Sequence, residues 1–396
     1  MKKLIIPVLI IIFLLAGTTF AVLYGKGYRF DFAQGRPDLS GTGLLVATSL
    51  PDGAQVFING HLTTATDNTI NLSPNTYDVK IVKEGYFSWE KNLVVKKEVV
   101  TKAEALLFPT TPKLESITST GVENPVLDPS QTKIAYTVSS QSASTKRGVF
   151  VLDMSSRPIL TLQGDSTQIA DDSSNTFSKA LLSWSPDGSQ LMATVSGTNT
   201  TIYTLDSGGF NSSPTDVTEQ MASVNAAWQK QRNDREKARL DTLQDNLKKV
   251  VNDNFNILSW SEDETKILYQ AKNDSTLPII IDPRLIGTNS IAEQRNLKKD
   301  AVYVYDIKED RNYKILDSFS GTELPLSWFP DSKHLVYVHD QKVDIMEYDA
   351  TNQTTIFAGP FVDHYVFPWP DGSKIVILTS LGNSNLAPNL YTITLK

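Results

Sequence analysis

The segment Leu182-Ser-Trp-Ser-Pro-Asp-Gly-Ser-Gln-Leu191 (LSWSPDGSQL) is the clearest copy of a repeated pattern in this chain. Leu182 and Trp184 alternate with polar residues and predict a short strand, and Leu191 begins a second strand. Between them, Pro-Asp-Gly predicts a tight turn, since proline presets φ and glycine tolerates a positive φ. The same strand-turn-strand unit recurs at residues 258–267, 326–335 and 367–375, with a degenerate copy at 126–134. Repeated strand pairs of this kind predict the blades of a β-propeller.

The spacing of the turn aspartates indicates how regular the repeat is. Asp331 and Asp371 are 40 residues apart, which is the length of one four-stranded blade. Asp187 and Asp263 are 76 residues apart, and Asp263 and Asp331 are 68 residues apart. Two blades therefore carry insertions. Five blades are visible, and a six-bladed ring with one unrecognised blade is the alternative.

The Trp-Ser-Pro-Asp-Gly-Ser-x-Leu pattern at residues 184–191 resembles that of TolB-type β-propellers, which are relatives of the WD-repeat architecture. The resemblance covers residues 112–396 and implies an all-β domain. A propeller ring usually closes with a strand from the other end of the domain. We expect the segment 105–117 to supply that strand beside residues 390–395.

The first insertion, residues 213–254, has the pattern of a helix. Ser213-Pro214 provides an N-cap followed by proline at the first helical position, and no later glycine or proline interrupts the segment. Two apolar stripes have helical spacing, namely Val217, Met221, Val224 and Trp228, and then Leu240, Leu243, Leu247 and Val250. We expect a helical hairpin that bends near Asn233-Asp234, with a single protruding coiled-coil helix as the alternative. The second insertion, residues 272–299, is predicted to be a long loop over one propeller face.

The N-terminal half holds a separate β module at residues 43–108. The segment Ser49–Gly60 (SLPDGAQVFING) predicts two tight turns around one short strand. Its Pro-Asp-Gly-Ala turn, together with the later Lys83-Glu-Gly-Tyr86, resembles the PEGA domain, although Asp52 stands where that family has glutamate. The resemblance implies a small extracytoplasmic β-sandwich that binds surface carbohydrate or protein and carries no catalytic residues.

The N-terminus is strongly apolar. Residues Leu4–Tyr24 form 21 positions without a charge, which as a helix would span roughly 30 Å, one hydrocarbon core. We therefore expect a transmembrane anchor at residues 1–24, with a cleaved signal peptide ending at Thr19–Ala21 as the alternative. The positive N-terminus favours an inside position, so the chain would be a single-pass membrane protein with its bulk extracytoplasmic. Residues 25–42 lack a period and predict a juxtamembrane linker.

The composition excludes several classes of function. A net charge of −7 over 396 residues leaves no basic footprint for nucleic acid. The absence of cysteine excludes disulfides, thiolate metal sites and a cysteine nucleophile. With only four histidines, the chain has few imidazole ligands from which a metal centre could be built. We therefore predict no metal and no cofactor.

The sequence also lacks a catalytic motif: no G-x-S-x-G elbow, P-loop or H-E-x-x-H is present, so no catalytic residue is assigned. The aspartates of the repeated turns are expected to bind backbone amides, and the repeated tryptophans to lie in the core. These residues are Asp187, Asp263, Asp331 and Asp371, and Trp184, Trp260 and Trp328. His334 is expected at the surface.

Aromatic residues are the best candidates for ligand binding. Tyr86, Phe87 and Trp89 cluster at one end of the PEGA-like module, where their rings would stack on sugar rings. The alternative is a hydrophobic plug between the sheets of that module.

Together these observations predict a membrane-anchored, extracytoplasmic, non-enzymatic binding scaffold that recognises a protein or a cell-envelope polysaccharide. The alternative is a glycosidase- or lyase-like propeller enzyme acting on envelope carbohydrate, which needs paired carboxylates in the central funnel. A third reading, the ectodomain of a sensor, needs a membrane partner for its output.

Overall fold

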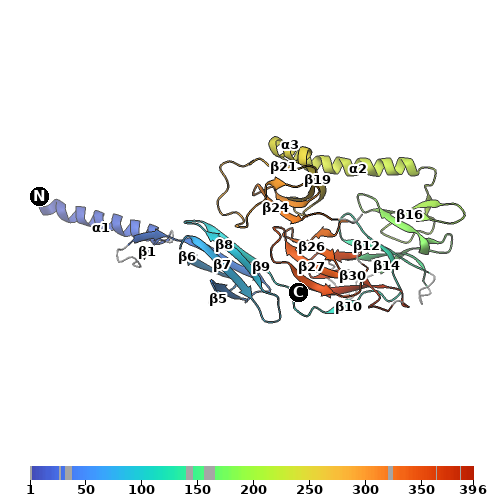
Figure 1. Ribbon diagram of the computed structural model, residues 1–396, viewed down its shortest axis with the longest axis horizontal. Helices are drawn as coiled ribbons and strands as arrows, with labels where there is room; N and C mark the ends of the chain where they lie inside the picture. Colours follow the sequence, from blue (N-terminus) through green and yellow to red (C-terminus); the bar gives the residue numbers. More distant parts are fainter. Residues whose placement is uncertain are drawn as a thin grey trace. The chain divides into compact units, whose positions relative to one another are not determined.

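Figure 1 shows the computed structural model of the chain, which describes residues 2–25, 28–31, 38–139, 146–155, 166–319, 324–362, 364–383 and 385–396. The described chain is mostly β, with three α-helices, and this confirms the predicted dominance of strands. It divides into two compact units. The first comprises Met1–Thr110 and Ile281–Glu293, and the second comprises Thr111–Ile280 and Gln294–Lys396.

Helix α1 spans Lys2–Gly25. No helix in the described part of the chain has both the length and the apolarity that crossing a membrane requires. The predicted transmembrane anchor at residues 1–24, with the N-terminus inside and the bulk extracytoplasmic, is therefore wrong.

The predicted linker at residues 25–42 contains regular structure. Strands β1 (Tyr28–Asp31) and β2 (Asp38–Gly41) pair antiparallel, with Tyr28 opposite Gly41. Linker residues 26–27 and 32–37 lie outside the described residues.

The β module of the first unit is built from two sheets, ordered β6-β3-β9 and β5-β4-β7-β8. Their bounds are β3 Gly43–Leu50, β4 Gln55–Ile58, β5 His61–Ala65, β6 Asn68–Leu72, β7 Asn75–Val82, β8 Trp89–Val95 and β9 Val100–Leu106. The buried residues of β8 alternate strictly with exposed ones, and those of both sheets form one core that includes Leu45, Val56 and Ile81. Two tight turns were predicted in the segment 49–60. In the first of them Gly53 has φ 67°, a conformation that favours glycine.

A segment from the second half of the chain completes the first unit. Ile281–Glu293 belongs to that unit, so the predicted loop at 272–299 does not lie over a face of the second unit along its whole length. The N–H of Val94, on edge strand β8, donates to the hydroxyl of Ser290 at 3.0 Å. Gly287 has φ +80°, and a Cβ there would lie 2.9 Å from Val99 Cγ1. The segment therefore covers the β8–β9 end of the module.

Five four-stranded antiparallel sheets make up most of the second unit. The first sheet is β11 Glu123–Leu127, β12 Lys133–Val138, β13 Gly148–Asp153 and β14 Ser166–Asp171. The second is β15 Leu181–Trp184, β16 Gln190–Val195, β17 Thr201–Asp206 and β18 Thr215–Asp216. The third is β19 Phe255–Trp260, β20 Lys266–Ala271, β23 Val302–Asp306 and β24 Arg311–Leu316. The fourth is β25 Leu326–Trp328, β26 His334–His339, β27 Lys342–Glu347 and β28 Thr354–Ala358.

The fifth sheet combines both ends of the second unit. Its strands are β29 Val366–Pro368, β30 Lys374–Thr379, β31 Asn389–Thr394 and β10 Leu114–Ser116. Leu114 pairs with Ile393 across β10 and β31, which confirms the predicted borrowing of a strand from the segment 105–117. Short elements complete the unit: a 3-10 turn at Phe177–Lys179, and the pair β21 Ser275–Thr276 and β22 Asn296–Leu297.

Neighbouring sheets share hydrophobic cores, which join the first sheet to the second, the first to the fifth, and the third to the fourth. The pairs Val151 and Trp184, Leu152 and Leu390, and Val304 and Met346 represent these three cores. The fifth sheet reaches the fourth through Gly372, where a Cβ would lie 3.0 Å from the Phe329 ring. No core cluster of described residues joins the second sheet to the third, so a closed propeller is not found there.

The helical insertion connects the second and third sheets. Helix α2 spans Met221–Asp241 and α3 spans Asp245–Asn254, so the break lies beyond the predicted bend at Asn233-Asp234 (Figure 1). Of the two packings open to the predicted stripes, on each other or on the flanking sheets, the structure has the second. Trp228 packs on the second sheet, and Leu243 and Leu247 pack on the third, because each sheet offers its own apolar surface.

Candidate functional site

The predicted binding aromatics lie where β7 leads into β8. Trp89 is 4% exposed and belongs to the core of the module, and Tyr86 packs against that core. Phe87 is half-buried, and its N–H donates to the carbonyl of Phe108 at 2.9 Å. A buried Trp89 presents no ring face to a sugar, so the stacking hypothesis is reduced to Tyr86 and Phe87.

The turn aspartates bind donors of their own turns. Asp187 accepts from the hydroxyl of Ser185 at 2.5 Å and from the N–H of Ser189 at 3.1 Å, and these bonds lower the pKa of its carboxyl. Asp263, Asp331 and Asp371 accept backbone N–H groups in the same way. The structural interpretation of these four residues is confirmed.

The repeated tryptophans and His334 are also structural. Trp184, Trp260 and Trp328 are 8%, 8% and 4% exposed, which confirms their placement in the core. The expectation of a surface His334 is wrong, because its ring is buried and its Nδ1 lies 2.6 Å from the Asp331 carboxylate. That carboxylate satisfies the imidazole in its buried position.

A cleft of about 810 Å³ opens in the second unit between the insertion and the sheets on either side of it. All of β19 lines it, together with one face of α2 and the end of α3. Pro129 and Pro186, from turns of the first and second sheets, complete the opposite side. The cleft therefore occupies the place where no shared core joins the second sheet to the third.

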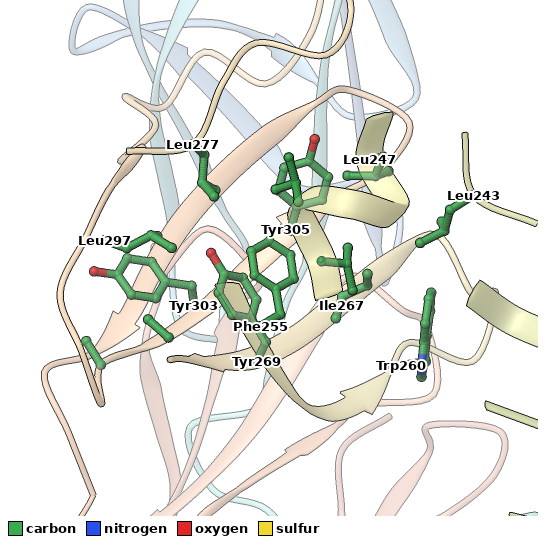
Figure 2. Close-up of a cluster of buried hydrophobic side chains, with 14 residues drawn as sticks. Leu243, Leu247, Phe255, Trp260, Ile267, Tyr269, Leu277, Leu297, Tyr303 and Tyr305 are labelled. Carbon is green, nitrogen blue, oxygen red and sulfur yellow. The ribbon is translucent and has the colours of Figure 1, made fainter. Parts of the chain in front are cut away.

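Stacked aromatic rings support the β19 wall from behind. Phe255 stacks on Tyr269 with ring centroids 3.5 Å apart, and Tyr269 stacks on Tyr303 at 5.6 Å. Figure 2 shows these rings side by side, with Leu247 of α3 and Tyr305 in the same cluster. Buried rings of this kind have few alternative rotamers, so β19 presents a firm surface to the cleft.

One polar network links α2 to β19 across the cleft floor. The indole N–H of Trp260 donates to both carboxylate oxygens of Glu236, at 3.0 and 3.1 Å. Arg239 lies 6.0 Å from the centre of the Trp260 ring, and its Nε pairs with Glu264 at 2.9 Å. These contacts fix the helix relative to the strand and satisfy the one carboxylate among the lining residues.

The cleft is more basic than the chain as a whole. Arg232, Arg235, Arg239 and Lys272 line it, against a single acidic residue, Glu236. The net charge of the chain is −7. The Arg235 side chain is exposed and makes no ion pair or hydrogen bond with any residue that the structure describes.

A second polar cluster lies on the β26–β27 hairpin. The His339 ring stacks on Tyr337 with centroids 4.3 Å apart, and its nitrogens face Asp344 at 2.9 Å and Asp340 at 3.3 Å. Partial burial acts to lower the pKa of His339, but the hydrogen bonds to both carboxylates outweigh it and raise the pKa. No group of three or more metal-binding side chains occurs among the described residues.

The cleft is not predictable from the sequence pattern. Its walls come from residues as far apart as Pro129 and Lys272, and neither the repeat nor the helical stripes indicate that they meet. One signal was present in the charged part of the insertion. Arg232, Arg235 and Arg239 are spaced by three and four residues, which places them on one face of a helix.

Comparison with known proteins identifies the β module of the first unit. Residues 42–110 match the family model of the PEGA domain, which confirms the predicted resemblance at residues 43–108. None of the curated proteins matches the chain.

Solved structures similar to the chain include propeller proteins. TolB from Acinetobacter baumannii matches with 14% identity, a TM-score of 0.23 and coverage of 81% of this chain and 59% of that chain. A putative TolB from Agrobacterium tumefaciens matches with 14% identity, a TM-score of 0.23 and coverage of 68% and 77%. The Mitotic Checkpoint Complex has 13% identity, a TM-score of 0.31 and coverage of 73% and 96%. At these values the likenesses carry no argument about function.

Proposed function

We propose that the chain is a non-enzymatic binding scaffold, and that the cleft beside β19 holds part of a partner protein. We also infer that the five sheets are the blades of an open propeller in which α2 bridges the gap between the second and third blades. The cleft carries the functional proposal. Its volume of about 810 Å³ is in the range of ligand-binding sites, and its wall is rigid.

A protein is a better ligand for this cleft than a neutral polysaccharide. Sugar rings bind on the open faces of aromatic side chains, but the two tryptophans of the lining, Trp184 and Trp260, are each only 8% exposed. Arginine side chains dominate instead, and arginine is enriched where proteins bind one another.

The glycosidase-like alternative gains no support from this cleft. That chemistry uses two carboxylates on opposite sides of the scissile bond. The described lining holds one, Glu236, and the indole of Trp260 already occupies both of its oxygens.

Site-specific photocrosslinking in cells tests the proposal. Asn256 is exposed and lines the cleft, so a benzophenone side chain at that position should crosslink to a partner protein. The same group at exposed Asn199, outside the lining, is the control. Blocking the cleft with Arg235→Trp should abolish the adduct at position 256. Adducts that are identical at both positions, or unaffected by the block, would refute a binding role for the cleft.

A further inference from the structure

We propose that the ligand of this cleft is an extended peptide segment rich in aspartate and glutamate, which adds as a strand to the free edge of β19. This inference rests on the proposed binding function and specifies the chemistry of its partner. Two independent features of the cleft carry it, the hydrogen-bonding edge of β19 and the row of cations on α2.

The edge of β19 that faces away from β20 is open. β19 is the outermost strand of the third sheet, and none of the described strands pairs with its other edge. The N–H of Lys272 donates to the carbonyl of Asn254 at 2.9 Å, so the peptide groups at that position point toward β20. Antiparallel hydrogen bonds alternate along a strand, so the N–H and C=O of Ile257 point the other way, up to the β-bulge that shifts the register between Ile257 and Ser259. The N–H of Phe255 already donates to the carbonyl of Val251, so Ile257 carries the open part of this edge. An added strand would satisfy them.

The face of α2 that lines the cleft supplies positive charge along its length. Arg232, Arg235 and Arg239 occupy one face of α2, and successive members rise by roughly 4.5 and 6 Å along the helix. Alternate side chains of an extended strand are roughly 6.6 Å apart and lie on one face. Glutamates at alternate positions of an added strand would therefore lie within side-chain reach of Arg232 and Arg235.

Among the cations of the cleft, Arg235 is the one most available to bind an anion. Arg239 is paired with Glu264, and the Lys272 ammonium donates to the carbonyl of Asn252 at 2.6 Å. Arg232 donates only to the side chain of Gln229, a neutral partner, at 3.2 Å. An incoming carboxylate would therefore find Arg235 and Arg232 available without breaking an ion pair.

A polyanionic sugar is the competing ligand, because it would also be attracted by the arginines. It has no peptide groups to pair with β19 and would leave that edge unsatisfied. The peptide uses both features of the cleft, so the observations favour it.

Fluorescence anisotropy with the full chain and three defined probes tests the inference. The probes are a labelled peptide of alternating threonine and glutamate, the same peptide with lysine in place of glutamate, and polygalacturonate. We expect the glutamate peptide to bind, the lysine peptide to bind at least tenfold more weakly, and polygalacturonate to compete poorly. Two further versions of the glutamate peptide carry N-methyl groups at every second residue, one at the odd and the other at the even positions. We expect only one of these versions to bind at least tenfold more weakly, because only one edge of the peptide faces β19.

Two variants of α2 locate the site. Arg235→Glu should weaken the glutamate peptide at least tenfold, whereas Lys230→Glu, an equal charge change at an exposed residue outside the lining, should weaken it less than threefold. Equal weakening by both variants, indifference to N-methylation, or equal binding of polygalacturonate would each overturn the inference. If no probe binds while position 256 still crosslinks a protein, the acidic-strand inference fails and the binding function stands. If position 256 does not crosslink a protein, the proposed binding function is itself refuted.

Discussion

Arg295 and Asp310 form a buried ion pair, with Nη2 of the guanidinium 2.8 Å from Oδ1 of the carboxylate and the Asp310 side chain 1% exposed. The same carboxylate accepts the N–H of Ile280 at 2.8 Å and the hydroxyl of Tyr305 at 2.5 Å. Ile280 is the last residue of the second unit before the segment Ile281–Glu293, which belongs to the first unit and is called the excursion below. Arg295 lies just after this segment, where the chain is again part of the second unit. One aspartate therefore holds both ends of the excursion.

Replacement of Asp310 by alanine should destabilise the second unit. It removes the carboxylate that pairs with the buried guanidinium of Arg295, and breaking a buried pair in this way costs about 3–5 kcal/mol. Urea denaturation of the full chain measures the change. Lys298→Ala, which removes an exposed pair with Asp274, is the control and should leave the urea midpoint unchanged. Similar losses in both variants would contradict the assigned role of Asp310.

Replacement of Glu236 by alanine should loosen the attachment of α2 to β19. The indole N–H of Trp260 then lacks an acceptor, a loss of about 1–3 kcal/mol. Glu236→Gln keeps an oxygen at the same place and should cost less than about 1 kcal/mol. The free energies of unfolding of the two variants, compared with that of the natural chain, test this order, and a glutamine variant as unstable as the alanine variant would contradict it.

The His339 cluster should make stability depend on pH. The pKa of His339 is raised above its ordinary value of 6.5, since its hydrogen bonds to Asp344 and Asp340 outweigh its partial burial. The folded state therefore binds the proton more tightly than the unfolded state. The contribution of protonated His339 to the free energy of unfolding is complete below about pH 6.5 and is lost as the pH rises through the pKa of His339 in the folded state.

The variant His339→Gln isolates this effect. The difference in unfolding free energy between the natural chain and the variant should shrink by about 1 kcal/mol between pH 5.5 and pH 9, the size of a partly exposed charge-assisted hydrogen bond. Denaturation curves at several pH values measure it. A difference that stays constant or grows with pH would show that the sign is wrong.

Substitution of Gly287 by alanine should weaken the contact of the excursion with β8 and β9. Its φ of +80° disfavours a side chain, and the new Cβ would lie 2.9 Å from Val99. We expect amide hydrogen exchange in residues 281–293 to accelerate about tenfold. Gly209→Ala is the matched control, because its Cβ would meet nothing within 4 Å. Unchanged exchange in the Gly287 variant would contradict the packing described.

Local patterns were sufficient to predict the repeated strand pairs with their turns and the borrowed strand of the fifth sheet. The reason is physical: a turn such as that of Asp187 is stabilised by residues within four positions of it. The position of the helix break was not predicted, because the burial of Trp228 and Leu247 on two different sheets decides it. The cleft and the docking of Ile281–Glu293 depend on contacts between residues far apart in the sequence. Such contacts leave no periodic pattern in a single sequence, so they could not be predicted from it.

The excursion of Ile281–Glu293 has a consequence for how the chain can be divided. The polypeptide passes between the two units three times, after Thr110, after Ile280 and after Glu293. A single cut at any of these points does not separate the two units, because at least one of the two fragments still contains residues of both. For the same reason, a gene fragment ending at Thr110 encodes the PEGA-like module without its covering segment Ile281–Glu293.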